Sequence, residues 1–132
     1  MTKHDLKGYL RMKAEMGRLD KQITELRRVI QSPKTSSITG MPRGGGHLTM
    51  DDEIHELDLM IADYSAQWDA LVLERMRIER AIRSLPDTLE RALMGYRYID
   101  GLTWEEICVK ISCGWDKTHR LHRSALIKLS EI

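Results

Sequence analysis

Two cysteines and two histidines near the C-terminus are the residues whose types could bind a metal ion. They follow the pattern C-x4-C-x5-H-x2-H and are Cys108, Cys113, His119 and His122. Structural zinc sites normally use more closely spaced cysteines, and the two histidines are expected to point in different directions. The pattern therefore favours reduced thiols and ordinary imidazoles, and neither a metal ion nor another cofactor is expected.

Basic residues of the same region could bind the phosphates and base edges of DNA. A helix over residues 115–129 would carry four basic residues and one acidic residue. At 100° per residue, Thr118, Leu121, Ala125 and Leu129 share one side, with His122 beside them. The opposite side and its flanks give the candidate DNA-binding residues: Trp115, Asp116, Lys117, His119, Arg120, Arg123 and Lys128.

These candidates have different expected roles. His119, Arg120 and Arg123, with Asp116, would lie near base edges, whereas Lys117, Lys128 and the first backbone amides of the helix would lie near phosphates. For Trp115 a core position and a contact with the sugar-phosphate backbone are both open.

Catalytic signatures are not evident. The serines cluster in residues 32–50, and no histidine stands with a carboxylate in a recognisable catalytic pattern. The glycine-rich segment 40–46 lacks the lysine of a phosphate-binding loop, since His47 follows it. We therefore expect no catalytic residue, no nucleotide site and no enzymatic activity.

Two short helices separated by a tight break would position the candidate residues. Thr103 can cap the first helix, and Glu106 can reach back to the backbone N–H of the cap. Residues 112–114, Ser-Cys-Gly, then interrupt the apolar pattern where a helix-turn-helix needs a compact corner.

This stretch resembles the helix-turn-helix of region 4 of bacterial sigma-70 factors. The similarity runs from residue 102 to residue 129, as L-T-x-E-E-I, a turn, and a helix ending A-L-x-K-L, preceded by R-Y-x-x-G at residues 97–101. The whole chain is similar to small phage regulators of the autolysin-regulatory-protein and late-gene activator families. Ser112 and Gly114 depart from the usual turn glycine and helix cap, so the corner is expected to form differently.

Residues 1–85 read as two long helices joined by a flexible linker at 32–50. Apolar residues recur at spacings of three and four, as in a heptad pattern, at Tyr9, Met12, Met16, Leu19, Ile23, Leu26 and Ile30. The second run is Ile54, Leu57, Ile61, Tyr64, Trp68, Leu71, Arg75, Ile78, Ile82 and Leu85. Trp68 is expected to pack in this pattern.

Pro86 is expected to end the second long helix, and a support helix with Leu89, Leu93 and Tyr96 on one face should follow. The expected fold class is all-α, with long antiparallel coiled-coil helices followed by a helix-turn-helix unit resembling sigma region 4. Residues 1–85 would form the coiled-coil and oligomerisation region, and residues 86–132 the DNA-binding domain.

Charge is segregated along the chain although the net charge is only +1. Residues 51–85 carry four basic and nine acidic groups, so positive potential near DNA must be local to the last helix. No run approaches the roughly 20 apolar residues of a membrane span, and a cytoplasmic location in a bacterial host is expected.

The expected function is a sequence-specific DNA-binding transcription regulator, encoded by a phage, that binds double-stranded DNA and contacts RNA polymerase. A homodimer through the long helices is expected, because Met60, Val72 and Met76 leave apolar surface beside the heptad positions. The alternatives are a coiled-coil adaptor or structural protein, and a small DNA-recognition subunit of a phage packaging machine.

Overall fold

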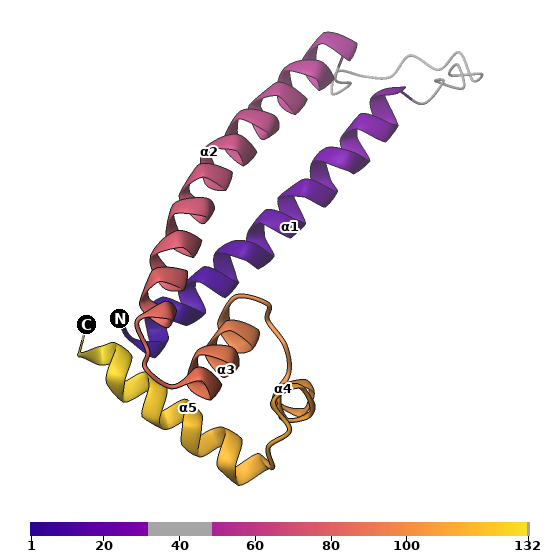
Figure 1. Cartoon of the computed structure of the whole chain (residues 1–132). Coiled ribbons are helices and arrows are strands. Elements are labelled where there is room, and N and C mark those ends of the chain that lie inside the picture. The colour runs from indigo at the N-terminus through magenta and orange to yellow at the C-terminus, as the bar shows by residue number, and fades with distance from the viewer. Residues whose placement is uncertain (32–48, 132) are drawn as a thin grey trace. The chain divides into compact units, whose positions relative to one another are not determined.

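The computed structural model of the chain describes residues 1–31 and 49–131, which form five α-helices and no strand (Figure 1). The expected all-α fold class is therefore confirmed. Most of the predicted linker, including the glycine-rich segment 40–46, lies outside the described residues. None of the described helices is long and apolar enough to cross a membrane.

The two longest helices, α1 (Lys3–Gln31) and α2 (Met50–Arg83), both begin at a reciprocal threonine–aspartate cap. At α1 the Asp5 N–H donates to the Thr2 hydroxyl at 3.3 Å, and the Thr2 N–H donates to the Asp5 carboxylate at 2.8 Å. Thr49 and Asp52 repeat this arrangement at α2. Because each cap satisfies amides that lack a helical partner, local sequence fixes both helix starts.

Contacts divide the chain into two compact units. One combines residues 1–14 with the residues from 69 onwards, and the other is residues 15–68. Each long helix therefore contributes to both units. In this division the first turns of α1 and the last part of α2 group with the C-terminal helices. The functional boundary expected at residue 85 stays a prediction.

The unit of residues 15–68 contains part of each heptad pattern. Met16 and Ile23 are buried, whereas Ile54 and Trp68 are 42% and 49% exposed. Trp68 was expected to pack, but its ring stacks on Tyr64 at a centroid distance of 6.3 Å and keeps half of its surface in water. The heptad spacing of the apolar residues thus predicts a helix, but it does not predict how deeply each residue is buried. The pairing of the two helices as an antiparallel coiled coil stays a prediction.

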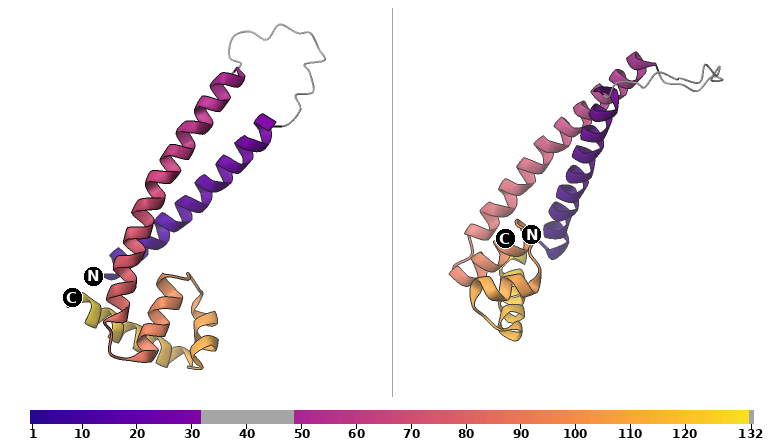
Figure 2. Two further views of the ribbon diagram at one scale, coloured as in Figure 1. Left: turned by 45° about the horizontal axis from the view of Figure 1, so that its top comes forward. Right: turned by 90° about the vertical axis from the view of Figure 1, so that its right-hand side faces the viewer.

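The other unit holds most of the buried side chains. Its helices α3 (Thr88–Tyr98), α4 (Trp104–Ile111) and α5 (Trp115–Ser130) contact one another pairwise and lie side by side in Figures 1 and 2. The large side chains that are almost fully buried in this unit are Leu6, Tyr9, Ile78, Leu85, Leu93, Met94, Tyr98, Ile107, Thr118 and Leu129.

The predicted support helix is α3, but its buried face differs from the expected one. Leu93 is buried as expected, whereas Leu89 and Tyr96 are only half-buried. The buried residues of α3 are Glu90, Leu93, Met94 and Tyr98. Because α3 contacts both α4 and α5, its covered surface is wider than the single apolar stripe that three residues can predict.

The corner between α2 and α3 is held by side chains of α3 and its cap. Asp87 accepts the N–H of Leu89 at 2.9 Å, which starts α3. The guanidinium of Arg91 donates to the Leu85 carbonyl at 2.6 Å and to the Pro86 carbonyl at 3.2 Å. These bonds tie the carbonyls of two residues of the connection after α2 to the first turn of α3.

The first turns of α1 belong to the same core. Leu6 is 0% exposed and Tyr9 is 2% exposed. The N-terminal ammonium of Met1 donates to the Leu129 carbonyl at 3.1 Å, and Lys13 donates to the Ile99 carbonyl at 3.0 Å. The start of the chain therefore completes the core around α3–α5.

Candidate nucleic-acid interface

The corner between α4 and α5 is formed by a residue in the left-handed conformation. Ser112 has φ 54° and ψ 42°, and the N–H of Cys113 donates to the Cys108 carbonyl at 3.1 Å. Among the described residues other than glycine, only Ser112 has a positive φ. The serine that stands in place of the usual turn glycine thus adopts the left-handed conformation, which glycine adopts most easily.

The start of α4 has the expected cap with one change. The Thr103 hydroxyl accepts the Glu106 N–H at 3.3 Å, as expected. The Glu106 carboxylate lies 3.1 Å from that hydroxyl rather than at the cap's backbone N–H. The cap therefore holds the helix start through one backbone bond and one side-chain bond.

The buried side of α5 packs on α3 and α4 largely as expected. Thr118, His122, Ala125 and Leu129 are buried, and Leu121 is half-buried. The half-buried Cys108 Sγ lies 3.4 Å from the Thr118 hydroxyl, where α4 meets α5. This packing fixes which side of α5 faces water.

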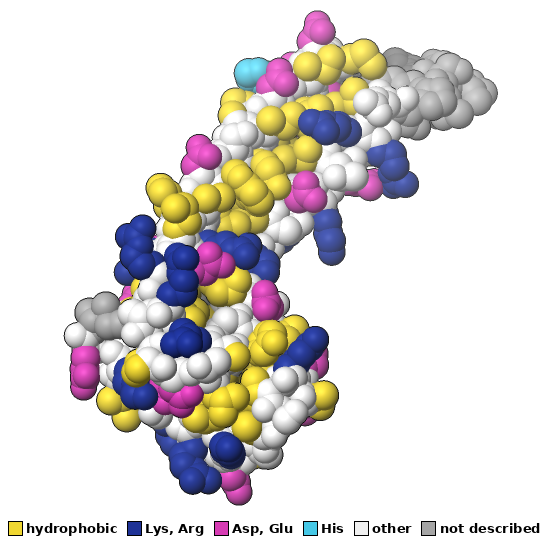
Figure 3. Space-filling view, viewed as in Figure 1, with side chains coloured by type: hydrophobic (Ala, Val, Ile, Leu, Met, Phe, Trp, Pro, Cys, Tyr) yellow, Lys and Arg dark blue, Asp and Glu magenta, His cyan; other side chains and the backbone are white. Residues whose placement is uncertain are grey.

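The water-facing side carries most of the candidate DNA-binding residues. Asp116, Lys117, Arg120 and Arg123 are exposed, and Trp115 is 52% exposed. Within the described part of the chain, no ion pair engages the three basic residues. Figure 3 shows basic side chains over α5 at the lower edge of the view. Their charges are therefore available to an anionic partner.

The amino end of α5 lacks a side-chain cap. Gly114 occupies the cap position and, having no side chain, makes no capping hydrogen bond. Backbone N–H groups of the first turn, which have no helical acceptor in any α-helix, therefore also lack a capping side chain. Such a helix end favours an anionic group through both its donors and the helix dipole.

Lys128, whose side chain is 40% exposed, forms an ion pair with a buried carboxylate of its own chain. Its ammonium lies 2.9 and 3.1 Å from the two oxygens of Glu90, whose side chain is only 3% exposed. The Ser124 hydroxyl donates to the same carboxylate at 2.7 Å. The structure thus gives Lys128 a position in which it neutralises a buried acid.

His119 lies between two tryptophans instead of on an open face. Its ring centroid is 4.5 Å from that of Trp104 and 4.5 Å from that of Trp115. Its Nε2 is buried without a hydrogen-bond partner among the described residues. Arg97 of α3 covers Trp104 at 4.6 Å, so the cluster links the support helix to the start of α5.

His122 is buried against Tyr98. The Tyr98 hydroxyl and His122 Nε2 are 2.7 Å apart. Burial, with smaller contributions from Lys3, His119, Arg97 and Arg123, lowers the pKa of His122 from 6.5 to about 4. His122 is therefore neutral near pH 7 and adds no positive charge to α5.

The cysteine–histidine pattern does not come together as a metal site. In the described residues, no three His, Cys, Asp or Glu side chains lie close enough to hold a metal ion. Cys108 contacts Thr118, Cys113 Sγ lies 3.4 Å from the Ile111 carbonyl, and each histidine contacts aromatic rings.

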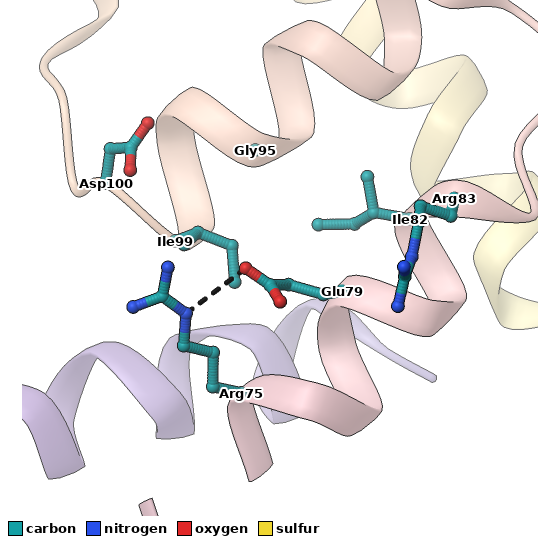
Figure 4. Close-up of a pocket in the computed structure, with 7 residues that line it drawn as sticks. All are labelled: Arg75, Glu79, Ile82, Arg83, Gly95, Ile99 and Asp100. Carbon is teal, nitrogen blue, oxygen red and sulfur yellow. Dashed lines mark hydrogen bonds and ion pairs between the residues drawn. The ribbon is translucent and has the colours of Figure 1, made fainter. Parts of the chain in front are cut away.

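A cavity of about 410 Å³ lies between α2 and the end of α3 (Figure 4). The Arg75 guanidinium bonds Glu79 at 3.1 Å along its wall, and Asp100 lies at its edge. The seven lining residues are Arg75, Glu79, Ile82, Arg83, Gly95, Ile99 and Asp100. Charges of both signs line this cavity, and none of the predicted site residues does.

Sequence reasoning missed two contacts between distant residues that hold the helix-turn-helix in place. Glu90 and Lys128 are 38 positions apart, so no local pattern connects them. The contact of Arg97 with Trp104 likewise depends on how α3 meets α4.

Comparison of the chain with protein-family models, curated proteins and solved structures found no match. The resemblance of residues 102–129 to sigma region 4 therefore rests on the residues that carry it.

Proposed function

We propose that this chain is a sequence-specific DNA-binding transcription regulator in which α4 and α5 act as a helix-turn-helix. The observation that carries the proposal is the unpaired basic side of α5. Lys117, Arg120 and Arg123 project from a helix whose opposite side is buried against α3 and α4. A rigid helix with exposed arginines suits the major groove, which is wide enough to admit it.

Roles follow from position on the helix. Arg120 and Arg123 reach base edges, where arginine forms paired hydrogen bonds to guanine. Lys117 and the uncapped amides after Gly114 bind phosphate, and Trp115 lies against the sugar-phosphate backbone. In this proposal Lys128 and His119 hold the helix in place, while Asp116 contributes to base selection.

Selection of bound sequences from random duplex DNA tests the proposal directly. We expect a defined sequence to be enriched, and Arg120→Ala and Arg123→Ala to lose about 1 to 3 kcal/mol of discrimination each. Arg11→Ala, at an exposed arginine of α1, serves as the matched control and should leave binding unchanged. Unchanged affinity in both α5 variants would remove α5 from DNA recognition.

Further parts of the proposal concern the partners. The resemblance to sigma region 4 and to phage regulators implies a phage-encoded protein that contacts RNA polymerase beside a promoter. We also propose that the long helices form an antiparallel coiled coil and that the protein acts as a homodimer.

A second candidate function is a protein adaptor, which the exposed apolar residues of α2 favour. Leu73 and Met76 are 68% and 50% exposed. Salt separates the two functions, because binding to phosphates weakens steeply as salt rises whereas an apolar contact does not.

A further inference from the structure

The outward side of α2 in the unit that contains α3–α5 carries an apolar patch. Ile78 of this helix is 0% exposed and points to the core. At 100° per residue, Leu73 and Met76 lie roughly opposite Ile78. They are 68% and 50% exposed, and Val72 beside them is 38% exposed. Figure 3 shows hydrophobic side chains along α2.

This patch has no function in the fold of its own chain. Single exposed apolar residues are common on protein surfaces, but adjacent ones on one side of a helix mark contact surfaces. The core of the unit is complete without Val72, Leu73 and Met76, since the buried residues of α2 lie on its other side: Leu71, Ile78, Ala81 and Ile82.

Two exposed charges of opposite sign flank the patch on the same line of the helix. Asp69 lies one turn before Leu73, and Arg80 lies one turn after Met76. The neighbouring Arg75 and Arg77 are held in ion pairs within α2, with Glu79 at 3.1 Å and Glu74 at 2.7 Å. No ion pair engages Asp69 or Arg80 among the described residues.

We propose that a second copy of this chain docks on the patch, with the two α2 helices antiparallel about a twofold axis. A twofold interface uses the same surface on both copies, so that surface must be self-complementary. The register that sets Leu73 against the partner's Met76 also sets Asp69 against the partner's Arg80. Both apolar and charged residues are therefore matched in one arrangement.

A parallel arrangement would not match the charges. It would set Asp69 against the partner's Asp69 and Arg80 against the partner's Arg80, and like charges in contact are destabilising. The antiparallel dimer is thus the arrangement that this sequence of charges favours.

The interface is small, because three apolar side chains from each copy form its centre. Interfaces below the standard size belong to weak and reversible complexes, so we expect the dimer to form in a concentration-dependent way. The inference deepens the dimeric part of the proposed function and does not rest on DNA binding.

Sedimentation velocity of the full chain over a range of concentrations tests the dimer. Leu73→Glu should weaken self-association about tenfold or more, because it places a charge in the apolar centre. The matched control is Val109→Glu, the same kind of change at a 79% exposed residue of α4, which should have no effect. A wild-type chain that stays monomeric at high micromolar concentration overturns the proposal, as does equal weakening by the control.

Charge exchange tests the register, at exposed positions where folding is not at risk. Asp69→Arg and Arg80→Asp should each weaken self-association roughly three- to tenfold, because each variant places like charges in contact twice. A mixture of the two variants, and the variant that carries both changes, should restore association. Single variants that associate like the wild type, or a mixture that does not recover, overturn the antiparallel register. Neither result bears on whether α5 binds DNA.

Discussion

Two histidines of α5, three positions apart, have surroundings that differ in kind. His122 is buried beside Tyr98, whereas the His119 ring lies tilted between the rings of Trp104 and Trp115. Residue type and spacing predicted a buried position for His122 and an exposed one for His119. The expectation for His119 did not take account of the indole rings of Trp104 and Trp115, which contact it from α4 and from the start of α5.

Burial of His122 makes the stability of the fold depend on pH. Its pKa falls from 6.5 to about 4 on folding, so between these values the unfolded chain binds a proton that the folded chain does not. The free energy of unfolding is not lowered by His122 above pH 6.5. It decreases by roughly 3 kcal/mol in all as the pH falls from 6.5 to about 4. Urea unfolding of the wild type at a series of pH values measures the loss.

His122→Gln should flatten this pH dependence, since glutamine does not titrate. His4→Gln, at an exposed residue, is the control and should leave the curve as in the wild type. Parallel curves for the wild type and His122→Gln would contradict the assignment.

Lys128 illustrates how one position can change a DNA-binding result without touching DNA. Lys128→Ala leaves the buried carboxylate of Glu90 without its cation and should cost about 1 to 3 kcal/mol of unfolding free energy. Lys117→Ala, on the exposed side, should cost less than about 0.5 kcal/mol. Thermal and urea unfolding compare the two variants. Equal stability of both, together with lost DNA binding in Lys128→Ala, would instead make Lys128 a direct contact.

At the scale of helices, local sequence predicts where elements begin and turn. The cap at Thr103, the proline after α2 and the break at residues 112–114 were predicted and lie where a helix starts or the chain changes direction. The structure has two further caps of the same kind, at Thr2 and Thr49. The buried side of α5 was also predicted, because its apolar spacing is regular. Each of these features depends on residues only a few positions apart, so a local sequence pattern is enough to predict it.

Packing between distant elements was not predictable in the same way. Tyr9 was assigned to the heptad pattern, and Leu6 was not singled out within the region 1–85, yet both complete the core around α3–α5. Trp68 fits the heptad spacing and remains half exposed. Spacing identifies the apolar side of a helix, but the element that covers this side depends on the whole fold.

The buried position of Leu6 leads to a prediction about a shorter side chain at this position. Leu6→Ala should destabilise the unit that contains α3–α5 by about 2 to 5 kcal/mol, as expected when the side chain of a fully buried leucine is shortened. Lys7→Ala, at the neighbouring exposed residue, should change stability by less than about 0.5 kcal/mol. Chemical unfolding measures both. Little effect of Leu6→Ala would mean that the start of α1 is not part of this core.

Deletion of residues 1–50 would therefore remove part of this core as well as part of the proposed oligomerisation region. Loss of DNA binding in such a truncated chain would follow from loss of Leu6 and Tyr9 as readily as from loss of a dimer. Point substitutions on the outward side of α2 avoid this ambiguity.

At the scale of the whole molecule, charges of each sign are concentrated in particular segments, while the net charge is close to zero. The net charge is +1, and the acidic residues 51–69 of α2 would repel DNA if they lay near it. In the proposed function, DNA binding therefore depends on the few basic residues of α5 and on the proposed pairing of two such helices on one duplex.

This arrangement predicts a moderate salt dependence of DNA affinity. With three basic side chains of each chain in the groove, Lys117 at a phosphate and Arg120 and Arg123 at base edges, each displacing counterions, a plot of log affinity against log salt should have a slope of about −3 for one chain and about −5 for a dimer. Lys117→Ala should reduce the magnitude of the slope by about 1 per chain. Fluorescence anisotropy at several salt concentrations provides the measurement, and a slope near zero would favour the adaptor function.

The half-exposed indole of Trp115 has an optical consequence. It lies at the start of α5, 52% exposed and with its ring centroid 4.5 Å from that of His119, whereas Trp104 is half-buried beneath Arg97. Indole emission depends on contact with water, so a duplex that covers Trp115 would shift the emission to shorter wavelength without any attached dye. The chain thus contains an intrinsic fluorescent reporter at the edge of its candidate recognition helix.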